Sequence, residues 1–265
     1  MSNRYFRIIQ WSFFIVTVLF LTVPLCFLVL KGMQGIVECM QSDEVMFSIK
    51  TSLKMSVLST VICMIAAVPV SCVLNTLKGM NKNIWTKVLF MPMSLPHLVS
   101  GIALLLVFGR NGIGDFLFDH YGIDFIFTPQ GIVLAQLFIN LPFAINGVLA
   151  ALEELDPKMV FVARSMGCNE FQAFRNVTLP LLKRALISNS IMTWTRALGE
   201  FGAVLMVAGS IQMKTEVIPT AIFLSMSSGN LDMAAGISVI LMIISWMGLW
   251  LFDRILIKQT NGIFQ

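Results

Sequence analysis

Few residues of this chain have types and spacing that could support catalysis. The two histidines, His97 and His120, lie apart in the sequence, and His97 directly follows Pro96 in an apolar run. An intramembrane hydrolase would need a Ser/His, Asp/Asp or zinc-ligand set on facing helices, and neither histidine has a visible partner. The five cysteines share no CxxC spacing, so we expect buried apolar side chains. The sequence therefore predicts neither an enzyme nor a metal site.

Arg196 and Glu200 are the charged residues inside the hydrophobic segment 185–211. They stand four residues apart on one predicted helix, where they can pair, and an unpaired charge at bilayer depth is costly. In one interpretation Arg196 meets an anion, and in the other the two residues form an internal ion pair that fixes this helix or its partner in a dimer. Because a glutamate beside the arginine opposes anion binding, we favour the ion pair.

The elements that must position these residues are membrane helices. The 265 residues are 57% hydrophobic and 12% charged, with a mean hydropathy of +0.85, whereas soluble domains carry about 25% charged residues. The composition predicts an all-α, polytopic membrane protein in contact with lipid. Loop lysines and arginines then indicate orientation and not nucleic-acid binding. No G-x-x-x-x-G-K-[ST] motif occurs, so any ATP use would come from another polypeptide.

Six apolar runs are long enough to cross a bilayer, which takes about 20 helical residues. We expect one transmembrane domain over residues 1–258, followed by a short cytoplasmic tail at 259–265. The segments 32–50, 77–87, 110–130, 153–184 and 210–232 are expected as loops. The expected spans cover residues 11–30, 55–74, 88–109, 131–152, 185–211 and 233–252.

The distribution of lysine and arginine predicts the orientation. If the N-terminus is cytoplasmic, twelve basic residues lie in inside segments and five lie outside or at the outer boundary, Lys31, Lys50, Lys54, Arg110 and Lys214. Because cytoplasmic loops carry the excess of basic residues, we expect both termini and the stretch 153–184 in the cytoplasm of a multi-pass cell-membrane protein.

Prolines and small polar residues inside the spans allow two interpretations. Ser56, Ser59, Thr60 and Ser100 fit interhelical packing and hydrogen bonding, which is the favoured interpretation for any single residue. Pro92, Pro96 and Pro142 favour a polar path, because freed carbonyls find partners beside a water-filled route. The candidate pathway residues are Ser94, Pro96, Asn140, Pro142, Arg196 and Glu200.

The stretch 153–184 is the longest polar interruption and holds nine of the 32 charged residues. Asp156 can cap a helix that begins at Pro157, and Gly167 suits the left-handed residue after its end. Asn169 can cap a second short helix, and Thr178 a third. This pattern predicts two short helices with a glycine corner, either docking to a partner protein or anchoring in lipid headgroups.

The spacing in this stretch resembles a known signature. Gly167 is followed, after nine residues, by Val177-Thr178-Leu179-Pro180. This pattern is similar to the E-A-A-x-x-x-G-x9-I-x-L-P signature of ABC importer permeases. Phe161 and Val162 stand where that family usually has glutamate and alanine. The segments MPMSLPHLVSGIALLLVFGRNG (91–112), TPQGIVLAQLFINLPFAINGVLAALEELDP (128–157) and RALGEFGAVLMVAG (196–209) resemble the molybdate, tungstate and sulfate branch.

The resemblance implies a permease subunit that imports an oxyanion by alternating access and binds no cofactor itself. ATP and Mg²⁺ would bind two cytoplasmic ABC ATPase subunits, a second permease copy would complete a homodimer, and an extracytoplasmic binding protein would deliver the anion. Molybdate or tungstate is the favoured substrate; sulfate or thiosulfate import is the alternative, and a stand-alone anion carrier a more distant one. The residues implied in coupling to the ATPase are Ala163, Arg164, Ser165, Met166, Gly167, Leu179 and Pro180.

Overall fold

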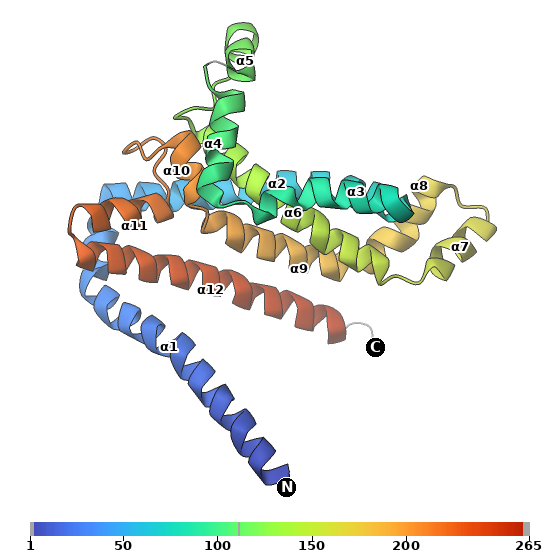
Figure 1. Ribbon diagram of the computed structural model, residues 1–265, viewed down its shortest axis with the longest axis horizontal. Coiled ribbons are helices and arrows are strands. Elements are labelled where there is room, and N and C mark those ends of the chain that lie inside the picture. The colour runs from blue at the N-terminus through green and yellow to red at the C-terminus, as the bar shows by residue number, and fades with distance from the viewer. Residues whose placement is uncertain (1–2, 111, 262–265) are drawn as a thin grey trace.

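A computed structural model describes residues 3–110 and 112–261, and most of them lie in helices (Figure 1). The first half of this range contains α1 (Asn3–Gln41), α2 (Asp43–Thr76), α3 (Gly79–Phe90), η1 (Met91–Ser94), α4 (His97–Phe108), α5 (Ile113–Tyr121) and α6 (Pro129–Glu153). The second half contains α7 (Pro157–Ser165), α8 (Glu170–Ala173), η2 (Phe174–Thr178), α9 (Leu179–Leu198), α10 (Gly202–Ala208), α11 (Ile218–Ser227) and α12 (Leu231–Asn261). The predicted all-α class is confirmed.

The expected loop at residues 32–50 is wrong. α1 continues to Gln41, and Ser42 caps α2 by accepting a hydrogen bond from the Val45 backbone N–H at 3.4 Å. The polar residues of this segment do not end the helix, because α1 packs closely along α12. A Cβ on Gly32 would lie only 2.6 Å from the carbonyl oxygen of Ala235. Glycine therefore permits a close helix contact here and does not mark a loop.

The expected third span, residues 88–109, is not one helix. α3 and η1 end before Pro96, α4 begins at His97, and the two parts are bent by 108°. Proline lacks the backbone N–H that would continue the helix and drives the preceding residue into extended conformation, and Leu95 has ψ 142°. The expected fifth span is also broken, since α9 ends at Leu198 and α10 begins at Gly202.

The described residues contain four helices that are long and apolar enough to cross a membrane, or five if the bent pair is one span. The four lie at Tyr5–Gln41, Asp43–Thr76, Pro129–Glu153 and Leu231–Trp250. The count of six spans stays a prediction. The expected loop 110–130 contains the short helix α5, which stands away from the body of the molecule beyond the far end of α4 (Figure 1).

One of three buried apolar clusters lies between α2, α6 and α9, and polar side chains bind these helices together. Ser71 Oγ donates to the Ile145 carbonyl at 2.9 Å, and Asn189 Nδ2 donates to the Ala144 carbonyl at 2.7 Å. Ser59 Oγ donates to Gln136 Oε1 at 2.8 Å. The packing interpretation is therefore confirmed for Ser59.

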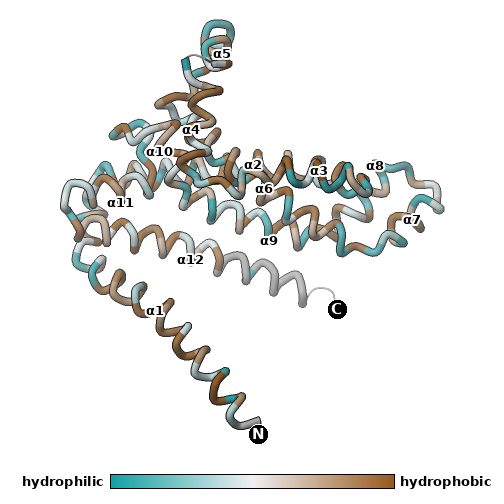
Figure 2. The backbone as a smooth tube through the Cα atoms, in the orientation of Figure 1, coloured by the Kyte–Doolittle hydropathy of each residue, from teal (hydrophilic) through white to brown (hydrophobic). Residues whose placement is uncertain are grey.

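The ends of the molecule differ in hydropathy (Figure 2). Hydrophilic residues gather at α5 and around α7 and α8, whereas most of α1 is hydrophobic. α12 runs from the end that holds α11 toward the end that holds α7 (Figure 1). Of the expected tail 259–265, residues 259–261 continue α12 and residues 262–265 lie outside the described residues.

Candidate functional site

The predicted pair of short helices in the stretch 153–184 is present as α7 and α8. Asp156 accepts a hydrogen bond from the Lys158 backbone N–H at 2.9 Å and begins α7. Asn169 accepts from the Gln172 N–H at 2.8 Å, while Gln172 Oε1 accepts from the Asn169 N–H at 2.9 Å. This reciprocal capping box satisfies two backbone donors at once. Both predicted caps are confirmed.

Gly167 forms the corner between the two helices. Its φ is +93°, its N–H donates to the Arg164 carbonyl at 3.0 Å, and the Cys168 N–H donates to the Ala163 carbonyl at 3.2 Å. These two bonds make the Schellman arrangement that closes a helix on a left-handed residue. A Cβ at Gly167 would meet no atom within 4 Å. The backbone angle, and not crowding, therefore requires glycine here.

The corner directs apolar side chains outward. Phe161 is 71% exposed and Met166 is 80% exposed, with Met159 and Val162 also exposed. Ala163 is buried, and α7 packs against η2 and α8. Soluble surfaces do carry scattered apolar residues, but a group on one short helix indicates a contact surface. Arg164 pairs with Glu170 at 3.1 Å, and Ser165 Oγ donates to the Phe161 carbonyl at 3.0 Å.

The expected third cap at Thr178 is wrong. Thr178 makes no side-chain cap and is buried inside a π-helical turn, η2, that joins α8 to α9. The Leu179 N–H donates to the Phe174 carbonyl, so the hydrogen-bonded helix has no break between Glu170 and Leu198. Leu179 and Pro180 form the first turn of α9, and both are exposed.

The expected ion pair between Arg196 and Glu200 is not formed. The guanidinium carbon of Arg196 lies 4.7 Å from the centre of the Phe143 ring on α6. Because α9 ends at Leu198, Glu200 lies beyond the last turn and the four-residue spacing no longer places the two side chains on one helical face. Arg196 instead makes a cation–π contact.

Glu200 pairs with His97. Its Oε2 lies 2.9 Å from His97 Nδ1, and its Oε1 accepts from the Ala203 N–H at 3.2 Å. The carboxylate therefore caps α10 and joins it to the start of α4. This contact corrects the expectation that His97 has no partner. Local spacing contains no signal for it, since the two residues lie on different broken spans.

The other candidate pathway residues lie at the α3–α4 break and in α6. Ser94 is exposed and its Oγ donates to the Met91 carbonyl at 2.7 Å, and Pro96 is also exposed. Asn140 and Pro142 are buried in α6; Asn140 Nδ2 donates to the Gln136 carbonyl at 2.9 Å, and its buried Oδ1 has no partner among the described residues. The candidates therefore differ in burial: those at the α3–α4 break are exposed, and those in α6 are buried.

Gln136 is a buried polar residue that was not predicted. It accepts from Ser59 and donates through Nε2 to the Ala197 carbonyl at 2.9 Å, at the end of α9. One amide thus links α2, α6 and the α9–α10 break. The sequence signal that could have suggested this role is a glutamine inside the apolar run 131–152, because a buried polar side chain needs hydrogen-bond partners.

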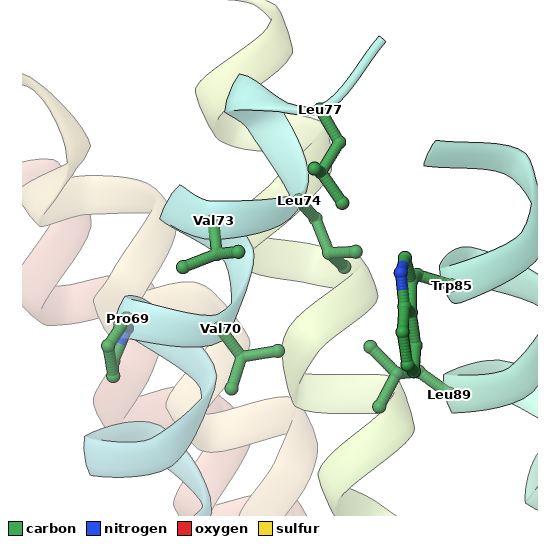
Figure 3. A pocket seen from close by; sticks show the side chains of 7 residues that line it. All are labelled: Pro69, Val70, Val73, Leu74, Leu77, Trp85 and Leu89. Carbon is green, nitrogen blue, oxygen red and sulfur yellow. The ribbon is translucent and has the colours of Figure 1, made fainter. Parts of the chain in front are cut away.

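Two depressions lie elsewhere on the described part of the chain. A depression of about 400 Å³ lies between the end of α2 and α3 (Figure 3), and its side chains, Trp85 among them, are apolar. A second depression, of about 720 Å³, lies at α4 and α5, and Arg110, Asp115 and Asp124 are among the residues that line it. The described residues contain no group of three His, Cys, Asp or Glu that could hold a metal ion, and their cysteines are free.

Comparison with known proteins finds permease proteins of transport systems among the relatives of this chain. The chain is 29% identical over 232 residues to the sulfate transport system permease protein CysW of Synechocystis sp., covering 88% of this chain and 83% of that protein. It is 34% identical over 194 residues to the molybdenum transport system permease protein ModB of Mycobacterium bovis, covering 73% of each.

The fold matches a solved transporter. A chain of the bacterial alginate ABC transporter, crystallised in complex with an alginate-bound periplasmic protein, superposes with a TM-score of 0.77 at 15% identity, over 95% of this chain and 93% of that one. Residues 67–256 match the family described as binding-protein-dependent transport system inner membrane component. This chain belongs to that family of ABC importer permeases, as a multi-pass inner-membrane subunit and not an enzyme.

Proposed function

We propose that this chain carries molybdate or tungstate across the membrane in an ATP-driven importer, and that α7 couples it to a separate ATPase subunit. The observation that carries the coupling is the fixed corner at Gly167, which presents Phe161 and Met166 to the surface. An apolar helix face held by caps on both sides suits a groove in a partner protein. Anchoring in lipid headgroups fits α7 less well, because Arg164 is already paired with Glu170.

The proposed arrangement places α7, α8 and both termini in the cytoplasm, in accord with the excess of basic residues in those segments. A second copy of the chain completes a homodimer, two ATPase subunits contact its two α7 helices, and an external binding protein delivers the anion. Closure of the ATPase dimer on ATP draws the α7 helices together and opens the path outward. The coupling residues are Ala163, Arg164, Ser165, Met166, Gly167, Leu179 and Pro180.

The proposed path follows the broken spans, where backbone and polar groups are free to meet a hydrated ion. Ser94 and Pro96 at the α3–α4 break are its exposed members. Asn140, Pro142, Arg196 and Glu200 support the helices around it.

Sulfate is the second candidate substrate, because sulfate permeases are among the relatives over most of the chain. The resemblance of residues 196–209 to molybdate and tungstate permeases favours molybdate or tungstate. Calorimetry of the partner binding protein with molybdate, tungstate and sulfate distinguishes the two. Tight binding of sulfate alone would transfer the assignment to sulfate import.

The coupling proposal is tested by purification. The chain carrying an affinity tag is extracted in mild detergent, and the expected result is a stable complex with a nucleotide-binding subunit. The variant Phe161→Asp is expected to lose that subunit while it remains in the membrane. A permease that purifies alone and still moves the anion without ATP would overturn the proposal in favour of a stand-alone carrier.

A further inference from the structure

His97 is an ionisable side chain in an apolar part of the chain. It begins α4, inside the apolar run 88–109, and its side chain is 48% exposed while that of Glu200 is 2% exposed. An ionisable group at bilayer depth that faced lipid would be costly, so such groups face a water-filled route or another protein surface. The exposed edge of the imidazole therefore marks one of these two.

The ring is held in one orientation. Glu200 binds Nδ1 at 2.9 Å and is itself fixed by the Ala203 N–H at the start of α10. Gly202 lets α10 pack directly on this part of α4, since a Cβ there would lie 3.0 Å from His97 Cβ and 3.1 Å from the Leu98 nitrogen. The remaining ring nitrogen, Nε2, has no hydrogen-bond partner within the described part of the chain.

The pair determines what Nε2 can do. Both ring nitrogens of a protonated imidazole are donors. In that form Nδ1 donates to the Glu200 carboxylate, and Nε2 presents its own N–H to the exposed edge. A carboxylate behind a histidine orients the ring in the same way as the partners of metal-bound histidines do. Nε2 is therefore a fixed N–H donor on the exposed edge.

We propose that His97 donates a hydrogen bond through Nε2 to the oxyanion as it passes the α3–α4 break, with Glu200 as the positioning residue. This inference rests on the proposed function. A tetrahedral oxyanion offers acceptor oxygens only, and a single donor on a ring already bound to the Glu200 carboxylate contacts it without trapping it. Weak contact is what conduction requires, because an ion must leave each site it enters.

Two substitutions separate this role from a structural one. His97→Gln places its amide nitrogen near the former Nε2, whereas His97→Asn places it near the former Nδ1 and so keeps the contact to Glu200. The permease, its ATPase and its binding protein are reconstituted in liposomes, and uptake of molybdate, and separately of sulfate, is measured per complex together with ATP hydrolysis. His120→Gln, on exposed α5, is the matched control.

Uptake per ATP is expected to stay within about threefold of wild type in His97→Gln and to fall by about tenfold in His97→Asn and His97→Ala, the factor for one lost hydrogen bond to a charged group. Equal or better uptake by His97→Asn would overturn the proposal and leave Nδ1 as the important atom. Reduced recovery of the complex with normal uptake per complex would also overturn it, in favour of a contact with the second copy. Absence of ATP-dependent uptake by the wild-type complex overturns the proposed function itself.

Discussion

Replacing Gly167 with valine tests the coupling role of the α7 corner. The φ of +93° is unfavourable for a β-branched residue, and such strain costs about 1–3 kcal/mol. No atom lies within 4 Å of the added Cβ, so this cost comes from the backbone alone. Relief requires loss of the hydrogen bonds from the 167 and 168 N–H groups, which releases α7 from its fixed angle.

A strain of this size shifts the equilibrium between fixed and released corner by about 5- to 150-fold. We expect Gly167→Val to hydrolyse ATP in the reconstituted complex while uptake per ATP falls strongly. Gly167→Asn is expected to be intermediate, because asparagine adopts left-handed conformations more readily. Uptake and phosphate release measured on the same liposomes give the ratio.

Gly229 provides the matched control for this experiment. It has φ +82° between α11 and α12, and a Cβ there also meets no atom within 4 Å. Gly229→Val thus introduces similar strain far from α7 in the chain, and we expect normal coupling. The reasoning is refuted if Gly167→Val transports with the normal ratio, or if both variants lose coupling equally.

Three further substitutions address packing and charge. Ala163→Leu overpacks the contact of α7 with η2 by about 1–3 kcal/mol and should reduce copurification of the ATPase subunit. Gln136→Leu leaves the buried Ala197 carbonyl without its donor, costs about 1–3 kcal/mol, and should lower the Tm in detergent. Burial first, and the Glu44 carboxylate second, raise the pKa of Glu216 in its loop. This folded-state pKa lies above the unfolded value of about 4.3, so the protonated form favours folding, and that stability is lost as pH rises through the folded pKa. Glu216→Gln should therefore raise the Tm near neutral pH and leave it unchanged in acid, as differential scanning fluorimetry can show.

Local signals predicted the two short helices and the glycine corner within residues 153–184 well. The caps at Asp156 and Asn169 and the turn at Gly167 each join residues no more than five positions apart, so residue type and spacing contain most of the information. The Thr178 cap failed for a different reason. Thr178 is buried within a continuous helix, so tertiary packing outweighed the local preference of threonine for the position before a helix start.

The membrane region was less predictable, because apolar composition hides where a helix breaks. Residues 88–109 form one hydrophobic run, yet Pro96 divides it with a 108° bend. A hidden helix break also explains the wrong prediction for Glu200. Its pairing with Arg196 assumed that one helix runs through both residues, but α9 ends at Leu198. The contact with His97 depends on two breaks that meet in space, and no local pattern records it.

The uninterrupted helix from Glu170 through η2 to Leu198 has a mechanical consequence. At about 1.5 Å per residue it runs for roughly 40 Å, and it includes the π-helical turn Phe174–Thr178. Because helices bend at π-helical turns, η2 is the point at which α8 can change its angle to α9 without a break in the helix. The other end of α9 is held where Gln136 donates to the Ala197 carbonyl.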